Sequence, residues 1–201
     1  MSIEFLRPTE TSAVRQHVDR RSFLDHFPKE GVGAEIGVFR GEFAQALLEK
    51  THPKMLYLID KWWHIAHEPK VQPSEWRKTE SSQIIDDFVS VVRVFQNELI
   101  GGTVDILVGD DLKILSNMPT DSLDWAYLDT THQYEQTKLE LSILSRIVKP
   151  DGIIAGHDWQ PDPSHRHHGV AKAVRELVDS GQYQLWYLDN HLQWGIRKDG
   201  E

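Results

Sequence analysis

The sequence predicts an α/β fold, a doubly wound and mostly parallel sheet that ends in an antiparallel hairpin. Short, nearly continuous apolar runs alternate with helix-like stretches, which is typical of strands that are buried on both faces. The last two strand-like runs are separated only by Asp189-Asn190-His191, a connection too short for a parallel pair. The chain of 201 residues suits one hydrophobic core, so 1–201 is predicted to be a single domain.

Seven apolar runs are predicted as strands, five of them parallel and the last two forming the hairpin. Most of the parallel runs end at an acidic residue or at glycine. In chain order the parallel strands are Ala34–Val38, Met55–Ile59, Val104–Val108, Leu123–Leu128 and Gly152–Ala155, and the hairpin strands are Tyr183–Leu188 and Leu192–Arg197.

Helices are predicted between these strands, where apolar residues recur at helical spacing. The clearest are Tyr134–Ile147 and Val170–Val178, and another begins at Gly41 and ends at about Lys50. A turn at Pro150-Asp151-Gly152 leads from the helix into the fifth strand. Each helix therefore connects two strands of the predicted parallel sheet.

Two segments depart from the simple alternation. Glu10–Phe27 looks helical and is predicted to be part of an N-terminal helical cap, residues 1–30, over the sheet or a pocket. Residues 61–100 form a long crossover that holds a helix-like stretch, Gln83–Leu99. Two interpretations are open for this crossover: a lid over a substrate, or a helix packed onto the sheet by its tryptophans, which are Trp62, Trp63 and Trp76.

Composition excludes several classes of function. The formal net charge of −9 disfavours nucleic acid as a partner, because phosphate binding relies on Lys and Arg. There is no cysteine, which excludes disulfides and thiolate chemistry and fits a cytoplasmic protein. No apolar run approaches the length of a membrane span, so no membrane association is expected. A small-molecule substrate and a cationic cofactor suit the acidic chain better.

Acidic residues mark the carboxyl ends of the predicted strands, the edge where open α/β sheets bind ligands. Glu35 lies in the first strand, and Asp60 ends the second. Asp110, with Asp111 beside it, follows the third strand, and Asp129 ends the fourth. Carboxylates at successive strand ends are a poor cradle for pyrophosphate. They suit a ligand with a sulfonium, an ammonium group and a ribose diol.

The glycines after the first strand agree with a nucleoside-type cofactor. Gly37 lets the backbone turn and approach a ligand closely, and Gly41 opens the following helix. The GxGxxG fingerprint of dinucleotide-binding folds needs a glycine where this chain has Phe39. This departure disfavours a nicotinamide cofactor, although Asp60 stands at about the expected distance for a ribose-binding acid.

The stretch GAEIGVFRGEFAQALL resembles the first motif of class I S-adenosylmethionine-dependent methyltransferases. YLIDKW resembles their second-strand motif, whose acid binds the ribose, and VGDD resembles the motif whose acid lies near the adenine. LDWAYLDTTHQYE followed by GHDW resembles a small bacterial subgroup with an IDGxHxYE…GHD signature. The resemblance covers about residues 30 to 197.

This resemblance implies a Rossmann-like fold, S-adenosyl-L-methionine as cofactor and methyl transfer to a small-molecule acceptor, with O-methylation expected. It implies cofactor contacts from Glu35, Gly37, Gly41, Asp60, Asp110, Asp111 and Asp129. The subgroup usually has Gly-Asp or Gly-Asn where this chain has Thr130-Thr131, so the local turn is expected to differ. Two alternatives stay open: a non-catalytic S-adenosylmethionine-binding protein and a nicotinamide-dependent oxidoreductase.

Asp129, His132, His157 and Asp158 are the candidates for the chemistry. Related sugar and phenol O-methyltransferases hold a divalent ion with acids at strand ends four and five. The resemblance thus implies a metal site at Asp129, His157 and Asp158, for Mg²⁺ or another divalent cation, where histidines favour Mn²⁺, Fe²⁺ or Zn²⁺. The catalytic alternative is a metal-free general base, either His132 or His157. Turn formation and structural hydrogen bonds are the non-catalytic alternatives for these residues.

Three further histidines, His165, His167 and His168, follow Pro161-Asp162-Pro163. A histidine-rich stretch of this kind can bind metal. The favoured interpretation is a solvated loop beside the pocket.

Overall fold

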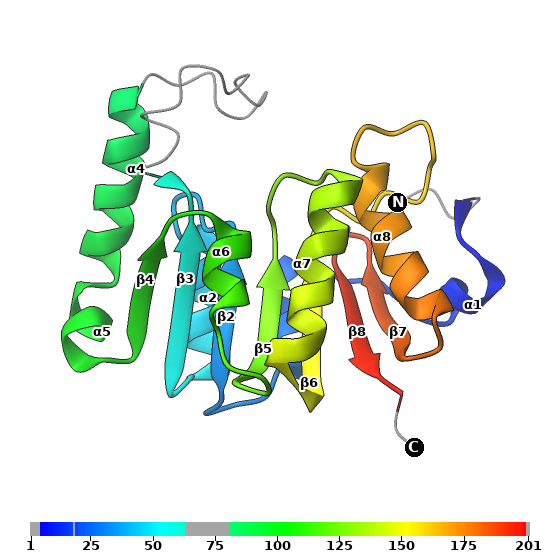
Figure 1. Ribbon diagram of the computed structural model, residues 1–201, viewed down its shortest axis with the longest axis horizontal. Helices are drawn as coiled ribbons and strands as arrows, with labels where there is room; N and C mark the ends of the chain where they lie inside the picture. The colour runs from blue at the N-terminus through cyan, green and yellow to red at the C-terminus, as the bar shows by residue number, and fades with distance from the viewer. Residues whose placement is uncertain (1–4, 18, 63–80, 200–201) are drawn as a thin grey trace.

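The computed structural model describes residues 5–17, 19–62 and 81–199, and within them it confirms the predicted fold class. Eight strands of this part of the chain form one sheet, in the order β1-β7-β8-β6-β5-β2-β3-β4 (Figure 1). β8 runs antiparallel to both β6 and β7, and all other neighbours are parallel. The strands are β1 (Val14–Arg15), β2 (Val32–Ile36), β3 (Met55–Asp60), β4 (Val104–Val108), β5 (Leu123–Leu128), β6 (Val148–Gly156), β7 (Tyr183–Asp189) and β8 (Trp194–Lys198).

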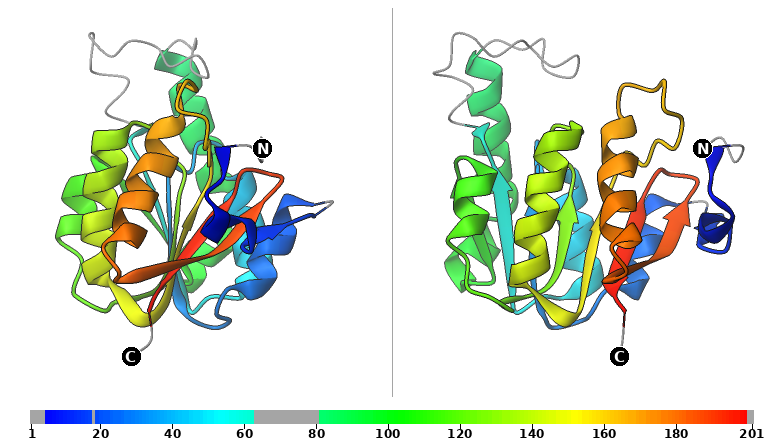
Figure 2. Two further views of the ribbon diagram at one scale, coloured as in Figure 1. Left: turned by 90° about the vertical axis from the view of Figure 1, so that its right-hand side faces the viewer. Right: turned by 45° about the vertical axis from the view of Figure 1, so that its right-hand side comes forward.

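Helices cover both faces of the sheet, as both views in Figure 2 show. One layer holds α6 (Asp111–Ser116), α7 (Tyr134–Ile147) and α8 (His168–Asp179). The other holds the 3₁₀ helix η2 (Arg20–His26) and α2 (Glu42–Thr51), with α4 (Ser81–Val94) and α5 (Gln96–Gly101) toward the β4 edge. A short helix, α1 (Pro8–Thr11), lies near the N-terminus.

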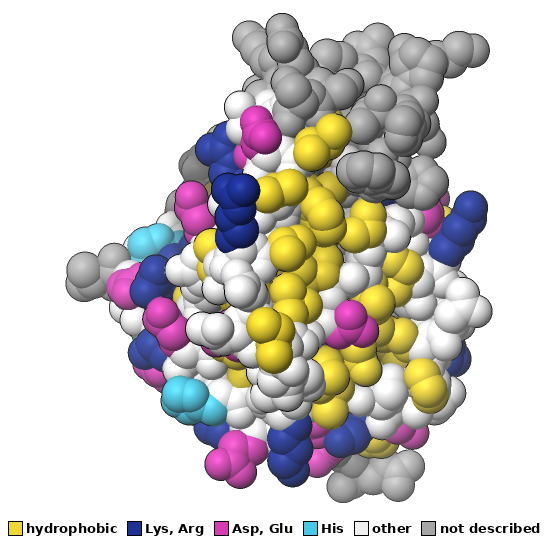
Figure 3. All heavy atoms as spheres, turned by 90° about the vertical axis from the view of Figure 1, so that its left-hand side faces the viewer, with side chains coloured by type: hydrophobic (Ala, Val, Ile, Leu, Met, Phe, Trp, Pro, Cys, Tyr) yellow, Lys and Arg dark blue, Asp and Glu magenta, His cyan; other side chains and the backbone are white. Residues whose placement is uncertain are grey.

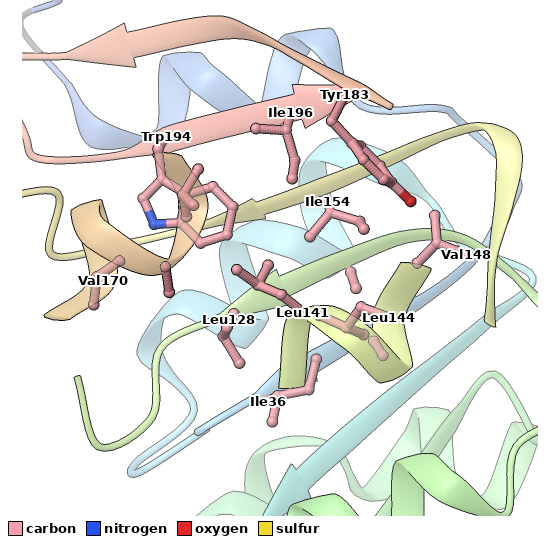
Figure 4. Close-up of a cluster of buried hydrophobic side chains, with 14 of the residues drawn as sticks. Ile36, Leu128, Leu141, Leu144, Val148, Ile154, Val170, Tyr183, Trp194 and Ile196 are labelled. Carbon is pink, nitrogen blue, oxygen red and sulfur yellow. The ribbon is translucent and has the colours of Figure 1, made fainter. Parts of the chain in front are cut away.

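The two helix layers explain why the strand sequences are nearly continuous apolar runs. Side chains alternate between the faces of a strand, so a strand covered on both faces needs apolar residues at every position. In β5, Trp125 and Tyr127 join the cluster with η2 and α2, whereas Ala126 and Leu128 join the cluster with α7 and α8. The latter cluster appears in Figure 4, where side chains from α7, α8 and the sheet converge.

The prediction of one helix over Glu10–Phe27 is wrong, because that stretch contains the end of α1, strand β1 and η2. β1 extends the sheet by pairing with β7, with Val14 opposite Leu188. The backbone of the neighbouring residue contributes as well, since the N–H of Leu188 donates to Ala13 O at 2.9 Å. These contacts with a distant strand fix an extended conformation that local helical preference alone does not predict.

The crossover after β3 is described in part. The predicted helix Gln83–Leu99 is divided at Phe95 into α4 and α5. Trp62 is buried, its ring centroid lies 5.4 Å from that of Phe88, and its Nε1–H donates to Phe39 O at 2.7 Å. The packing interpretation therefore holds for this tryptophan. Trp63 and Trp76 lie outside the described residues, and the lid stays a prediction.

Apolar side chains gather on the face formed by α4, α5 and β4 (Figure 3). The large hydrophobic residues exposed on these elements are Ile85, Val94, Ile100 and Val108, and Ile100 is 80% exposed. β4 is also an edge strand of the sheet. Among the described helices, none is both long enough and apolar enough to cross a bilayer.

The strand order reverses between β2 and β5. From β2 the chain continues outward through β3 and β4, and from β5 it continues in the opposite direction through β6. The carboxyl ends of β2, β3, β5 and β6 meet at this switch point. Open α/β sheets bind their ligands in the crevice that such a reversal creates.

Candidate functional site

The loop after β2 turns sharply toward α2 at the switch point. Gly37 has a φ of 90°, and its N–H donates to Ile59 O at 2.9 Å. Gly41, with a φ of 79°, is the N-cap of α2, as predicted. Between them Phe39 has a φ of 55°, so it takes the left-handed conformation that glycine provides in the dinucleotide fingerprint. The missing glycine therefore does not prevent a tight loop.

Asp60 supports this loop from the end of β3. Its Oδ2 accepts hydrogen bonds from the N–H of Val38 at 3.0 Å and of Phe39 at 2.8 Å. The side chain is buried, with 8% of the residue exposed. Asp60 thus fixes the loop after β2, a role that its sequence position did not predict. Ribose binding by Asp60 stays a prediction.

Glu35 is a fully buried acid next to this loop. Only 2% of the residue is exposed, and Oε2 has no hydrogen-bond partner among the described residues. Burial, together with the nearby charge of Asp129, raises the pKa of Glu35 well above its ordinary value. An unpaired buried carboxyl group is costly, so this atom is suited to a cationic or hydrogen-bond-donating ligand.

Asp110 and Asp111 lie where the sequence predicted, after β4, and both have protein partners. Asp110 is the N-cap of α6 and accepts from the N–H of Lys113 at 3.1 Å. Lys61 Nζ lies 3.3 Å from Asp110 Oδ2 and 3.1 Å from Asp111 Oδ1. Asp110 is the more accessible of the two, because Asp111 is buried.

Thr130, where the resembling subgroup has glycine, anchors the turn after β5. Its Oγ1–H donates to Glu140 Oε1 at 2.8 Å, and Gln136 Nε2–H donates to the same oxygen at 3.1 Å. Burial and a hydrogen bond with Asp111 raise the pKa of Glu140 to about 9. Gln136 Nε2–H also donates to Asp111 Oδ2 at 3.1 Å, so a partly buried network through α7 joins the turn that follows Asp129 to the start of α6.

Three histidines and two aspartates converge at the carboxyl ends of β5 and β6. Asp158 Oδ2 lies 2.8 Å from His132 Nε2 and 3.2 Å from His157 Nδ1. Its Oδ1 lies 3.1 Å from His167 Nδ1. Asp129 completes the group, with Oδ1 3.2 Å from His132 Nε2 and Oδ2 3.9 Å from His157 Nδ1. All the predicted catalytic and metal-binding candidates thus lie together.

The electrostatics of this cluster depend on close pairing. Burial opposes the charged form of His132, but its hydrogen bonds with Asp129 and Asp158 raise its pKa to about 9. Burial likewise opposes ionisation of Asp158, but hydrogen bonds with His132 and His157 hold the pKa of this carboxyl well below its ordinary value. The hydrogen bonds to two carboxylates thus favour the protonated form of His132, so His157 is the better candidate for a general base.

His167 contradicts the favoured interpretation of its stretch as a solvated loop. It precedes α8, its side chain is 14% exposed, and it contacts Asp158. His168 Nδ1 instead lies 2.9 Å from Gln160 O, while His165 is exposed and lies edge-on to the His167 ring. The sequence gives no signal that separates these three, because the fold of the loop decides which one enters the cluster.

Arg20 is a site residue that the sequence analysis missed. It comes from η2, and its NH2 lies 3.0 Å from the Tyr127 hydroxyl and 3.2 Å from Asp129 Oδ2. Its guanidinium also lies 4.2 Å from the centroid of the Phe43 ring. Burial opposes the charge on Arg20, but Tyr127 and Asp129 outweigh it and raise the pKa of this guanidinium. The N-terminal segment therefore contributes a cation to the mostly acidic site.

Comparisons with known proteins agree with this architecture. A family model described as a methyltransferase domain matches residues 34–159, which contain the glycine loop and the strand ends up to Asp158. No curated protein sequence is significantly similar to the chain.

Solved structures with the same fold are similar in shape but distant in sequence. The methyltransferase PaMTH1 of Podospora anserina, bound to SAH, is 13% identical with a TM-score of 0.59, covering 84% of this chain and 71% of that one. A SAM-dependent methyltransferase from Aquifex aeolicus is 15% identical with a TM-score of 0.57, covering 94% and 92%. A precorrin-8w decarboxylase from Methanobacterium thermoautotrophicum is 15% identical with a TM-score of 0.55, covering 98% of both chains. Identities this low support the shared fold and no shared substrate.

Proposed function

This chain belongs to the methyltransferase domain family, and from that premise we propose that it transfers a methyl group from S-adenosylmethionine to a small-molecule acceptor, at oxygen. The observation that carries the proposal is the pairing of Asp60 with the glycine loop at the sheet's switch point. Beside this pairing lies a cluster that offers both acids and histidines. One half of the crevice suits a nucleoside cofactor, and the other suits an acceptor.

The residues present fit S-adenosylmethionine. The buried Oε2 of Glu35, which has no partner in the described part of the chain, is suited to a cationic or donating group of the cofactor. Asp60 would hold the ribose hydroxyls, and the backbone at Gly37 would lie beside the methionine portion. Gly41 would set the start of α2, and Asp110 would lie nearest the adenine, with Asp111 behind it. The cofactor supplies an electrophilic methyl group on a sulfonium.

The proposed reaction is a displacement in which the acceptor oxygen replaces sulfur on the methyl carbon. An acceptor hydroxyl would lose its proton, its oxygen would form a bond to the methyl carbon, and the bond between that carbon and sulfur would break. The products would be a methyl ether and S-adenosylhomocysteine, a neutral thioether. The protein has to orient the acceptor in line with the bond that breaks and to provide a place for the proton.

Two ways of handling that proton follow from the cluster. Asp129, His157 and Asp158 offer ligand atoms that lie within 4.8 Å of one another, and they would hold a divalent cation. Such an ion lowers the pKa of an acceptor hydroxyl. In the alternative, His157 accepts the proton without a metal, since the hydrogen bonds of His132 with Asp129 and Asp158 favour its protonated form. We favour the metal, because this part of the site brings two carboxylates and an imidazole, all metal-binding groups, within 4.8 Å of one another.

The test is calorimetric binding followed by a methyl-transfer assay. We expect S-adenosylmethionine and S-adenosylhomocysteine to bind with one site per chain, and NAD⁺ to bind far more weakly. Tighter binding of NAD⁺ would favour the nicotinamide-dependent oxidoreductase instead. Transfer of a labelled methyl group to hydroxylated small molecules then separates an enzyme from a non-catalytic cofactor-binding protein. Cofactor binding with no transfer to any acceptor in a broad panel would favour the non-catalytic protein.

A further inference from the structure

We infer that the cluster is a histidine-rich transition-metal site, in which His132 and His167 bind one ion together with Asp158. The inference rests on the proposed function for the location of the site and adds the identity of the ion and two ligands. Imidazole nitrogen and carboxylate oxygen together favour ions such as Zn²⁺, Mn²⁺ and Fe²⁺, whereas Mg²⁺ prefers oxygen ligands.

The distances place Asp158 at the centre of two overlapping ligand sets. His132, Asp158 and His167 form one set, and Asp129, His157 and Asp158 form the other. Within each set the candidate ligand atoms lie within 4.8 Å of one another. Two ligands of one tetrahedral ion are about 3.3 Å apart at ordinary metal–nitrogen distances. Changes of about 1.5 Å or less in the separations between ligand atoms therefore bring either set onto a single ion.

Backbone packing delivers His167 to this site. A Cβ atom on Gly169 would lie 2.5 Å from Tyr134 N and 2.9 Å from His132 O, so the start of α8 is pressed against the turn that carries His132. This close approach brings the rings of His132 and His167 to a centroid distance of 4.7 Å. The two imidazoles come from segments far apart in the sequence, and the position of α8 holds them together.

Charge balance also suits a divalent cation. The side chains of His132, His157, His167, Asp129 and Asp158 are between 14% and 24% exposed, so the cluster is partly shielded from water. Two carboxylates and three neutral imidazoles carry a charge of −2, and Arg20, 3.2 Å from Asp129 Oδ2, offsets one of these charges. The cluster with neutral imidazoles therefore stays anionic, which favours a divalent cation.

A neighbouring histidine provides a matched control. His168 is adjacent to His167 in sequence and is also partly buried, but its Nδ1 contacts the carbonyl of Gln160 and it belongs to neither ligand set. His167→Gln should weaken the metal site, whereas His168→Gln should leave it unchanged. Thermal unfolding of both variants verifies that each is folded.

The experiment is a titration of untagged, metal-free protein with Co²⁺, followed by visible absorption. We expect one ion per chain with the d–d bands of a nitrogen- and oxygen-ligated site, displacement by Zn²⁺, and little displacement by millimolar Mg²⁺. His167→Gln should lower the Co²⁺ affinity at least about tenfold. Absence of the bands, equal competition by Mg²⁺, or unchanged affinity in His167→Gln would overturn the inference.

Cofactor binding separates this inference from the proposed function. S-adenosylhomocysteine titrated in the presence of a chelator tests the cofactor half of the crevice without any metal. Loss of cofactor binding with an intact Co²⁺ signal would mean that the proposed function is wrong and the metal site is right. Normal cofactor binding without a Co²⁺ signal would mean that the metal site is wrong and that the cofactor half of the proposed function stands.

Discussion

Gly37 lies directly against the carbonyl oxygen of Asp129, because a Cβ atom on residue 37 would be 2.0 Å from that oxygen. The contact joins the loop after β2 to the end of β5 across the switch point. Gly37 is therefore needed by the fold itself. Close approach of the cofactor to Gly37 stays a prediction.

Gly37→Ala should lower the free energy of unfolding by about 2–4 kcal/mol, combining a left-handed φ with overpacking against backbone. Gly102 is the matched control, because its φ is 73° but nothing lies within 4 Å of its Cβ position. Gly102→Ala should cost only about 1 kcal/mol. Urea unfolding measures both variants. Equal losses would mean that the backbone at residue 129 yields easily.

Asp60→Ala should weaken binding of S-adenosylhomocysteine by roughly ten- to a hundredfold, since a hydrogen bond to a charged group contributes about 1.5–3 kcal/mol. It should also destabilise the protein, because the N–H groups of Val38 and Phe39 lose their acceptor. Calorimetry and thermal unfolding measure the two effects. Asp105→Ala, at an exposed position on β4, is the control and should change neither. Wild-type affinity in Asp60→Ala would remove Asp60 from the cofactor site.

Arg20→Gln should destabilise the protein by about 1–3 kcal/mol, because Asp129 and the Tyr127 hydroxyl lose a charged, partly buried donor. The control is Arg21→Gln, whose guanidinium lies 3.8 Å from Glu49 in an exposed pair. That substitution should cost less than about 1 kcal/mol. Denaturant unfolding of the two variants provides the comparison. If Arg20→Gln were no more costly than Arg21→Gln, Arg20 would not hold the site together.

Glu140 should make the protein less stable as the pH rises. The folded-state pKa of about 9 lies above that of a glutamate in an unfolded chain, so between these values only the folded protein holds the proton. The contribution of Glu140 to the free energy of unfolding is greatest below its unfolded-state pKa. It falls as the pH rises, until the pH passes the folded-state pKa. Between pH 6 and pH 8 this group alone should contribute a loss of about 1.4 kcal/mol per pH unit.

Unfolding midpoints of Glu140→Gln across this pH range test that slope. The amide cannot ionise, so the pH dependence should be flatter than in the wild type by the contribution of one proton. Glu135→Gln, at an exposed position on the same helix, should keep the wild-type slope. A Glu140→Gln slope identical to that of the wild type would mean that Glu140 is ionised in the folded protein at neutral pH.

Removal of the metal should abolish methyl transfer and leave cofactor binding intact, because Asp60 and the Gly37 loop lie on other strands. With an acceptor in hand, activity should disappear in a chelator and return with added divalent ion. Asp158→Asn should lose activity in the same way, whereas Asp162→Asn, in the loop before α8, should retain it. Full activity in the chelator would instead favour His157 as a metal-free base.

The parallel strands β2 to β6, and the acidic residues that follow most of them, could be predicted from the sequence, whereas β1 could not. A strand buried on both faces needs apolar residues at successive positions. Neighbouring residues in the sequence show this pattern, as in Leu123–Leu128. The hairpin follows from an equally local feature, the short connection before β8. The positions of Asp60, Asp110 and Asp129 at strand ends follow from the same runs, so these acids of the candidate site could be predicted without a structure.

Only the tertiary structure decided the contacts between residues that are distant in the sequence. Arg20 and Asp129 are 109 residues apart, and no local pattern marks η2 as the element that reaches the end of β5. Likewise, the sequence does not distinguish His165, His167 and His168, which are the same residue type in one stretch. The close approach of Gly169 to the turn at His132 brings His167 into contact with Asp158. Local pattern determines which residues form strands because each strand buries its own side chains. The sheet order and the docking of α8 determine which side chains meet, because those depend on packing among all the elements at once.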